Sequence, residues 1–400
     1  MGIKVSIIIP SYNRYPQNLL TLYSLQNQTF DPSKMEVILV DDGSNDDTFQ
    51  IPKIFHPLFL FKFIRCEKNT GRSRARNIGI EKANGEIIVF LDAEMIVNPD
   101  FVQNHYDYHQ SYKKMVLTGA LGYHSMFSFI FPQFNKVELK RIAKLVQFDE
   151  VFLKRFQTFT QTKRPTQMVF QEDIDSLRFQ KLSYFSQSSI DKNTITLFGE
   201  KLTGFQIPWI AFLTGNVSIR KELLQTAGQF DETFNGWGFE DWELGYRIYK
   251  LGATFAYSQN VASYHQEHPV TDHRNWEASL KNFYLFQEKH PDIDVLVIAF
   301  ILMGQFDRLE IDEILKQYKR LEKEYPNQFS NFKDSIPALL KSASKMTASK
   351  FLIEGNPIKN LFVRSKSHHR KELTQSDRNT VKSLGTFDKL VCAFDFLSGL

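Results

Sequence analysis

Two carboxylates separated by a single residue offer a clear opportunity for chemistry in this 400-residue chain. Asp92 and Glu94 come directly after the apolar run 86–91, which has the composition of a buried strand. Burying two charged carboxylates without partners would cost too much free energy for both to be ordinary core residues. Carboxylate oxygens suit a hard divalent cation, so the pair predicts a site for Mg²⁺ or Mn²⁺, with Ala93 between the two ligands.

A second acidic pair, Glu240-Asp241, begins a predicted helix and follows the loop Gly236-Trp237-Gly238. Glycines beside an aromatic ring allow a tight loop that approaches a ligand closely. A carboxylate at the start of a helix can act as a general base toward a hydroxyl or a thiol. The alternative is that both acids only complement the helix dipole. The glycines and the tryptophan favour the catalytic interpretation.

Histidines farther along the chain could complete a metal site. His265 follows the predicted strand 262–264, and imidazole is a ligand that Mn²⁺ accepts. His268 and His273 lie close by in the sequence, so the choice among the three histidines stays open.

The first two predicted strands each end in a polar turn. The first turn offers an aromatic ring and a guanidinium group, which together suit a base, a ribose and a phosphate. The second turn offers two adjacent carboxylates to base N–H groups and ribose hydroxyls. Such turns also occur as plain helix caps and loops, so each is a moderate signal by itself. The candidate ligand-binding residues are Pro10, Ser11, Tyr12, Arg14, Asp41 and Asp42.

An arginine-rich segment, 69–79, leads into another predicted helix. Guanidinium groups and a helix N-terminus both favour a phosphate group. Arg72 and Arg76 share a face at helical spacing while Arg74 points elsewhere, so at least one of the three is expected to be solvated. The candidates for a phosphate contact are Asn69, Gly71 and Arg76.

Alternating strands and helices must position these groups. The apolar runs read as buried parallel strands, and their alternation with helices predicts an α/β fold with a parallel sheet. In open α/β sheets ligands bind beyond the carboxyl ends of the strands, which the candidate residues follow. Strands are predicted over 4–10, 36–40, 61–66 and 86–91, with helices over 17–27 and 74–83.

Length and composition bound the remaining possibilities. A chain of 400 residues exceeds what one hydrophobic core usually serves, so we expect a main domain with an appendage. The formal net charge of +4 is too mild and dispersed to favour nucleic acid as a partner. Cys66 and Cys392 form neither a disulfide framework nor a zinc motif, which favours a reducing cytoplasm. The apolar run 293–303 is shorter than the roughly 20 residues that span a bilayer, so no transmembrane helix is predicted.

We expect residues 1–275 to form the main domain and residues 276–400 a mostly helical C-terminal region. Segment 125–205 is predicted to be an irregular insertion over the sheet and a candidate acceptor region. The helical region could equally serve as an interface between copies in a homo-oligomer. The basic stretch 359–382 is typical of a solvated surface, and peripheral contact with the inner face of a membrane is the alternative.

The ordered motifs resemble the family 2 glycosyltransferases, which have the GT-A fold, a Rossmann-like sheet that binds nucleotide sugars. The part of the chain that follows residue 214 further resembles the C-terminal half of chondroitin polymerase-like enzymes and of the polypeptide N-acetylgalactosaminyltransferases. Several motifs in the same order are more specific than any one of them. The matching segments are 6–14, 40–44, 69–79, 90–94 and 236–243.

The resemblance implies a role for each matching residue. Asp92 and Glu94 would occupy the family's Asp-x-Asp metal motif, and His265 would be the third protein ligand. Asp241 would be the base of an inverting reaction, with Glu240 beside it binding the acceptor or the donor sugar. Glu94 departs from the usual Asp, so its contact with the cation is direct or through water. Residues implied in binding the UDP-sugar donor are Pro10, Ser11, Tyr12, Arg14, Asp41, Asp42, Asn69, Gly71, Arg76, Asp92, Ala93, Trp237 and Gly238.

The predicted function is therefore a metal-dependent transfer from a UDP-sugar, with inversion, using Mn²⁺ or Mg²⁺. Retention is the weaker alternative, since the polypeptide-glycosylating enzymes are retaining. The acceptor is either a cell-surface glycan or a peptide or protein side chain. A non-catalytic nucleotide-sugar-binding or scaffold protein is disfavoured by the two acidic pairs. A nucleotidyltransferase would need a glycine- and lysine-rich phosphate loop, which residues 11–14 do not provide.

Overall fold

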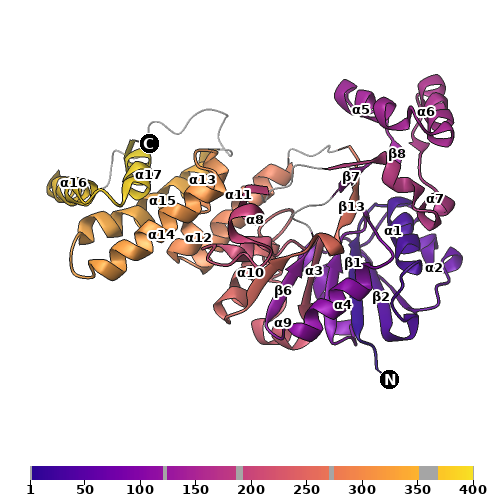
Figure 1. Cartoon of the computed structure of the whole chain (residues 1–400), viewed down its shortest axis with the longest axis horizontal. Coiled ribbons are helices and arrows are strands. Elements are labelled where there is room, and N and C mark those ends of the chain that lie inside the picture. Colours follow the sequence, from indigo (N-terminus) through magenta and orange to yellow (C-terminus); the bar gives the residue numbers. More distant parts are fainter. Residues whose placement is uncertain (1, 120–123, 186–191, 270–273, 351–367, 400) are drawn as a thin grey trace. The chain divides into compact units, whose positions relative to one another are not determined.

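The computed structural model describes residues 2–119, 124–185, 192–269, 274–350 and 368–399. The chain divides into two compact units, whose helices and strands are labelled in Figure 1. The first unit comprises Met1–Thr203, Pro208–Asn235 and Glu240–Asp272. The second unit comprises Gly204–Ile207, Gly236–Phe239 and His273–Leu400.

A seven-stranded sheet in the order β12-β6-β11-β4-β1-β2-β3 is the centre of the first unit. The predicted α/β class is confirmed, but the sheet is mixed, because β11 runs antiparallel to both β4 and β6 while all other neighbours are parallel. Between β6 and β11 the chain forms a long segment outside this sheet, and β11 then runs in the direction opposite to that of its two neighbours. The strands are β1 (Val5–Ser11), β2 (Met35–Asp41), β3 (Leu60–Arg65), β4 (Ile87–Leu91), β6 (Met115–Thr118), β11 (Asn216–Arg220) and β12 (Thr254–Tyr257).

Helices cover both faces of this sheet. One face packs on α1 (Gln17–Gln26), α2 (Ile51–Ile54) and α4 (Phe101–Ser111) through a continuous apolar core. The other face packs on α3 (Arg72–Lys82), which approaches β1 so closely that a Cβ on Gly79 would lie 2.3 Å from a methyl group of Ile8. The buried, apolar central strands are what a sheet covered on both faces requires. The remaining helices of this layer are α9 (Lys221–Ala227) and α10 (Glu240–Lys250).

A smaller four-stranded sheet, in the order β10-β7-β13-β5, follows the carboxyl end of β4. Strand β13 pairs antiparallel with β5 and parallel with β7, so it draws the segment after residue 262 toward the turn that follows β4. Its strands are β5 (Met95–Val97), β7 (His124–Met126), β10 (Ser183–Phe185) and β13 (Ser263–Gln266).

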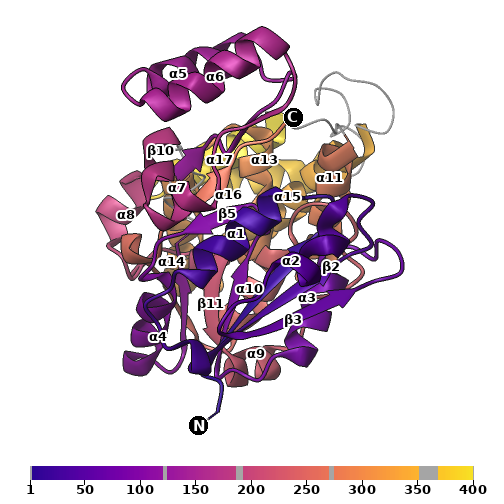
Figure 2. The same cartoon turned by 90° about the vertical axis from the view of Figure 1, so that its right-hand side faces the viewer.

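The segment predicted to be an irregular insertion contains a helical hairpin, and its apolar residues form a second core with Leu20, Ile96 and Tyr264 of the flanking elements. Helices α5 (Lys136–Val146) and α6 (Glu150–Thr162) lie side by side and project away from the central sheet (Figure 2). Asn135 begins α5 with a capping box to Glu138, a local signal that explains where the helix starts. The other elements here are α7 (Gln171–Asp175), α8 (Lys192–Phe198) and the two-stranded sheet β8 (Phe129–Ile130) and β9 (Thr166–Gln167).

The second unit is helical in its described residues. One face of α14 (Arg308–Glu324) is apolar, and Ile311, Leu315 and Leu321 on it are buried. Across the described part of the chain, no helix combines the length and apolarity needed to cross a membrane. The helices of the second unit are α11 (Arg274–Lys289), α12 (Ile293–Leu296), α13 (Ala299–Met303), α14 (Arg308–Glu324), α15 (Ser330–Lys350), α16 (His368–Ser383) and α17 (Asp388–Gly399).

Candidate functional site

The side chain of Arg76 joins the two acidic motifs that the sequence singled out. Arg76 lies on α3 and is almost fully buried. Its Nη1 donates a hydrogen bond to Glu240 Oε1 at 3.0 Å, and its Nη2 lies 3.4 Å from Asp92 Oδ1. A buried guanidinium is stabilised only when carboxylates compensate the loss of water, so this arginine holds both acids in one place. Residues from α3, the turn after β4 and the start of α10 thereby form one site.

Asp241 lies beside this group at the first turn of α10. Its Oδ1 accepts a hydrogen bond from the backbone N–H of Trp242 at 2.8 Å. Burial and the neighbouring Glu240 carboxylate raise the pKa of Asp241 to about 7, although the charge of Arg76 opposes the shift. A carboxylate whose pKa lies near neutrality is well matched to accept a proton from a hydroxyl group.

A second cluster consists of Glu94, His265 and His268. Each offers one potential ligand atom, and these atoms all lie within 4.8 Å of one another. The pairing of β13 with β5 places His265 opposite Met95, directly beside Glu94 in the chain. The antiparallel register thus brings Glu94 and His265, which are 171 positions apart in the chain, next to each other.

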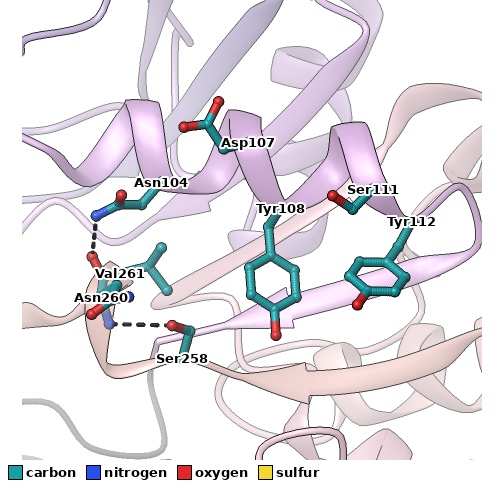
Figure 3. Close-up of a pocket in the computed structure, with 8 residues that line it drawn as sticks. All are labelled: Asn104, Asp107, Tyr108, Ser111, Tyr112, Ser258, Asn260 and Val261. Carbon is teal, nitrogen blue, oxygen red and sulfur yellow. Dashed lines mark hydrogen bonds between the residues drawn. The ribbon is translucent and has the colours of Figure 1, made fainter.

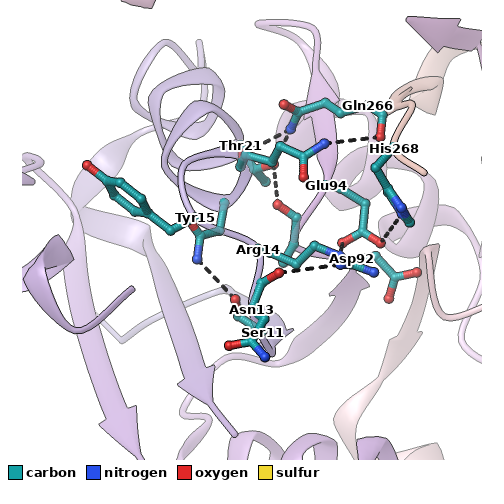
Figure 4. Close-up of polar contacts among 12 residues, drawn as sticks. Ser11, Asn13, Arg14, Tyr15, Thr21, Asp92, Glu94, Gln266 and His268 are labelled. Atoms are coloured by element: carbon teal, nitrogen blue, oxygen red, sulfur yellow. Dashed lines mark hydrogen bonds and ion pairs between the residues drawn. The ribbon is translucent and has the colours of Figure 1, made fainter. Parts of the chain in front are cut away.

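A guanidinium group and an imidazole lie beside the Glu94 carboxylate. His268 Nε2 lies 3.7 Å from one of its oxygens, and Arg14 Nε lies 3.3 Å from the other (Figure 4). Burial alone would oppose ionisation, but the adjacent His268 side chain and the charges of Arg14 and His265 hold the pKa of Glu94 well below its usual value. Glu94 is therefore an anion at neutral pH.

The donor set of this second cluster fits a divalent cation. An anionic carboxylate with two imidazoles is suited to Mn²⁺, and a carboxylate also suits Mg²⁺. His265 Nδ1 lies 3.4 Å from Glu267 Oε1, an outer carboxylate of the kind that orients metal-binding imidazoles. Within the described residues Asp92 is not part of this grouping, since one of its oxygens faces Arg76 instead. His273 lies outside the described residues.

The two carboxylates after β2 are engaged by the surrounding loops. Asp42 accepts hydrogen bonds from the backbone and hydroxyl of Thr70, at 2.8 and 2.7 Å, and from the backbone N–H of Gly71 at 2.9 Å. Asp41 is fully buried and accepts a hydrogen bond from the backbone N–H of Ser44 at 2.9 Å. Both acids therefore shape the loops at this edge of the sheet, and their contact with a nucleoside stays a prediction.

The turn after β1 presents mixed surroundings for the predicted donor-binding residues. Tyr12 is 43% exposed, while the buried Ser11 hydroxyl accepts a hydrogen bond from Asn18. Arg14 points toward Glu94 in Figure 4. Pro10 is half-buried at the end of the strand. An exposed tyrosine ring at the carboxyl edge of the sheet is free to stack on a planar ligand.

The remaining residues predicted to contact the donor lie on two segments, the arginine-rich segment 69–79 and the loop 236–238. Asn69 is exposed, and Gly71 precedes α3 with a φ of +95°, a conformation that glycine adopts without strain. Arg74 faces Glu232 at 3.1 Å and is partly exposed, and Arg72 is exposed rather than on the buried face of Arg76, so Arg76 alone of the three is buried. The predicted donor-binding residues Trp237 and Gly238 belong to the segment that groups with the second unit, and Trp237 is 45% exposed.

Several residues that support the site carried no recognisable sequence signal. The Thr21 hydroxyl donates to the backbone carbonyl of Ala93 at 2.7 Å and so holds the turn between the acids Asp92 and Glu94. Gln266 Nε2 donates to the carbonyl of Gln17 at 2.9 Å and ties β13 to α1. Their types are common in helices and strands, so only the tertiary contacts reveal them.

The chain is similar in sequence to known glycosyltransferases. The family model "Glycosyl transferase family 2" matches residues 6–183, and the model "N-terminal domain of galactosyltransferase" matches residues 197–269. The uncharacterized glycosyltransferase YfnE of Bacillus subtilis is 30% identical over 322 residues, which are 80% of this chain and 78% of that protein. Chondroitin synthase of Escherichia coli is 30% identical over 295 residues, covering 72% of this chain but only 38% of that longer enzyme.

A solved structure with a related arrangement is that of S. aureus TarS 1-349 in complex with UDP-GlcNAc. The match covers 99% of this chain and 90% of that chain, at 16% identity and a TM-score of 0.49.

Proposed function

Because the chain belongs to glycosyltransferase family 2, we propose that it transfers a sugar from a UDP-sugar to an acceptor with the help of a divalent cation. The predicted enzyme class, a glycosyltransferase with the GT-A fold, follows from that membership. The donor nucleotide, the cation, the stereochemistry and the acceptor make up the proposal. Each rests on a different part of the site.

The observation that carries the proposal is the group of Arg76, Asp92, Glu240 and Asp241. Asp241, with a pKa raised to about 7, would accept the proton of the acceptor hydroxyl as that oxygen attacks the anomeric carbon. Glu240, held by Arg76, would orient the sugar through hydrogen bonds to its hydroxyls. A base on the acceptor side supports attack from the face opposite the leaving group, and hence inversion.

The leaving group would depart toward the cationic part of the site. Glu94, His265 and His268 would hold Mn²⁺ or Mg²⁺, with Asp92 as a further candidate. The bound cation would neutralise charge on the departing diphosphate. Arg14 would add a fixed positive charge at the same edge, since its guanidinium already lies against Glu94.

For the acceptor we propose a glycan. The E. coli relative is named a chondroitin synthase, and its match covers 72% of this chain. A peptide or protein side chain is the alternative acceptor, and a non-catalytic nucleotide-sugar-binding protein is the alternative class. The basic stretch that could contact a membrane lies partly outside the described residues.

A donor screen tests the reaction class. Release of UDP from a panel of UDP-sugars would be measured with Mn²⁺, with Mg²⁺ and with a chelator, for the wild type and Asp241→Asn. Asp231→Asn, an acid in the loop before α10 whose carboxylate accepts from Thr233, is the matched control. We expect cation-dependent release that falls about 100- to 10,000-fold in Asp241→Asn and is unchanged in Asp231→Asn.

Two further measurements separate the alternatives. Calorimetric titration with UDP and Mn²⁺ distinguishes an enzyme that waits for its acceptor from a protein that does not bind the nucleotide, and absence of binding would reject the donor assignment. NMR of the product from a UDP-α-sugar reports the anomeric configuration, and an α-linked product would reject inversion.

A further inference from the structure

A cavity of about 330 Å³ lies on the first unit, outside the group of residues described above. It opens between α4 and the turn 258–261 that follows β12 (Figure 3). Cavities that hold small ligands in proteins begin at about this size. None of the predicted donor, metal or catalytic residues lines it. The lining residues are Asn104, Asp107, Tyr108, Ser111, Tyr112, Ser258, Asn260 and Val261.

The lining combines aromatic faces with hydrogen-bonding groups. Tyr108 lies on α4 and Tyr112 follows its last residue, and their ring centroids are 5.8 Å apart with planes tilted by 38° (Figure 3). The other positions supply amides, hydroxyls and one carboxylate, with Val261 as an apolar patch. A sugar ring needs this combination, because its C–H faces pack on aromatic rings while its hydroxyls require donors and acceptors.

Hydrogen bonds hold the walls of the cavity in place. Asn104 Nδ2 donates to the carbonyl of Asn260 at 2.7 Å, and the N–H of Asn260 donates to Ser258 Oγ at 3.2 Å. Lys201 Nζ donates to the hydroxyl of Tyr112 at 3.0 Å. A site whose side chains are already ordered loses less conformational entropy when a ligand binds.

The position of the cavity relates it to the transfer site within the same unit. Ser258 comes directly after β12, which is parallel to β6, and β6 is parallel to β4 because both run antiparallel to β11. The carboxyl ends of β12 and β4 therefore point to the same edge of the sheet. Three strand spacings, about 14 Å, separate them. Strands β1 to β3, where the nucleoside is predicted, lie on the far side of β4 from the cavity.

We propose that this cavity is a second saccharide-binding site, which holds sugar units of a glycan acceptor away from the point of transfer. The inference rests on the proposed glycan acceptor. A chain-like acceptor reaches from the cavity along the sheet edge toward Asp241. The exposed Asp107 carboxylate at the rim and the Lys201 ammonium on Tyr112 offset each other, so the cavity offers no net positive charge to an anionic sugar and suits neutral, hydroxyl-rich ones.

Direct binding to the full-length protein tests the site. Saturation-transfer NMR would measure the affinities of chitotriose, cellotriose, maltotriose and lactose, with an anionic hyaluronan tetrasaccharide for comparison. Ser111→Trp fills the cavity, while Gln110→Trp adds the same bulk at the neighbouring exposed position that does not line it. Tyr112→Ala removes one aromatic face, and Tyr112→Phe keeps the ring but removes the hydroxyl.

We expect at least one neutral oligosaccharide to bind the wild type and Gln110→Trp equally. Its binding should be lost in Ser111→Trp, weakened at least tenfold in Tyr112→Ala, and weakened less in Tyr112→Phe. Absence of binding across the neutral panel, or binding that survives Ser111→Trp, would overturn the proposal. Preference for the anionic tetrasaccharide would overturn the assignment of neutral sugars.

The same variants separate this inference from the proposed function. UDP release in the absence of acceptor should be unchanged in Ser111→Trp, since the cavity shares no residue with the donor site. Saccharide binding that is lost in Ser111→Trp would support the cavity even if no UDP-sugar is turned over. Conversely, UDP-sugar turnover without saccharide binding would leave the proposed function standing and reject the second site.

Discussion

Two pairs of histidines in the first unit occupy opposite surroundings. His105 and His109 lie one turn apart on α4 and are fully buried beneath the helix. His265 and His268 lie on and just after β13, half-buried beside Glu94. Both pairs are close enough in sequence to suggest a shared ligand, yet their neighbours give them different chemistry.

The hydrogen-bond partners of the buried pair are neutral, although His109 Nδ1 has no partner among the described residues. His105 Nδ1 and His109 Nε2 each lie 2.8 Å from the hydroxyl of Ser218, and His105 Nε2 lies 3.2 Å from Asn216 Oδ1. Burial, with His109 nearby, lowers the pKa of His105 to about 3, and burial with Arg220 nearby lowers the pKa of His109 to about 4. These imidazoles therefore stay neutral and serve the packing of α4 on β11.

The half-buried pair has carboxylate partners instead. Glu94 contacts His268, and Glu267 contacts His265. A carboxylate beside an imidazole creates a donor set for a cation, whereas a serine hydroxyl shared by two imidazoles only completes a buried hydrogen-bond network. The neighbours of a histidine, more than its spacing from another histidine in the sequence, therefore decide whether it belongs to a functional site.

Among the histidine variants, the largest expected effect comes from His265→Ala. Removing an imidazole from the cation-binding group should reduce metal-dependent UDP release about 100-fold, because a ligand and its oriented partner are lost together. Steady-state UDP release at several Mn²⁺ concentrations measures the loss, and part of it should be recovered at high Mn²⁺. His56→Ala, at an exposed histidine outside the site, is the matched control. Unchanged release in His265→Ala would remove this residue from the metal site.

His105→Ala should break the buried pair without touching catalysis. The change leaves the buried Ser218 and Asn216 side chains short of a partner, so the free energy of unfolding should fall by about 1–3 kcal/mol. Urea denaturation measures the fall, and UDP release per folded molecule should stay at the wild-type value. A specific loss of activity with unchanged stability would show that the α4 pair is functional and would undo the comparison.

His268→Asn should have a smaller effect than His265→Ala. Asparagine keeps a polar group near Glu94 but removes the imidazole nitrogen that lies 3.7 Å from its carboxylate. We expect UDP release to fall about tenfold, mostly through weaker binding of Mn²⁺. Titration of activity against Mn²⁺ would reveal the change. An effect as large as that of His265→Ala would make the two histidines equal partners.

The smallest effect should be a loss of stability on mild acidification. Histidines in the unfolded chain take up protons near pH 6.5, but His105 and His109 in the folded protein do not until the pH falls to about 3 and 4. Their contribution to stability is therefore complete above pH 6.5 and is lost as the pH falls below it. From pH 7.5 to pH 6, proton uptake by these two histidines in the unfolded chain should lower the free energy of unfolding by about 1–2 kcal/mol.

Urea denaturation at both pH values measures this loss. The variant His105→Gln, which lacks one of the two buried imidazoles, provides the comparison. His105→Gln should show a shallower decrease than the wild type over the same range, since one of the two buried imidazoles is gone. The charged and titratable neighbours of the pair within the described chain are each other and Arg220. An equal slope in the variant would assign the acid sensitivity to other groups.

Much of the first unit could be predicted because its signals are local. The apolar run before Asp92 forms β4, the runs that begin near residues 4 and 36 form β1 and β2, and the arginine-rich helix forms α3. The acidic pair Glu240-Asp241 begins α10 as expected. The antiparallel course of β11 and the α5–α6 hairpin were not predicted, because the insertion carries few patterns that identify its partners.

Local patterns in the sequence predict where strands, helices and polar turns lie, because apolar periodicity and helix caps depend on residues that are near neighbours in the chain. The sequence also identified Glu94, His265 and Asp241 as chemically suited residues. Only the tertiary structure decided that Arg76 joins Asp92 to Glu240 and that His268 completes the group around Glu94. Those contacts depend on strand order and register, which arise from the packing of the whole sheet and leave no mark in any short stretch of sequence.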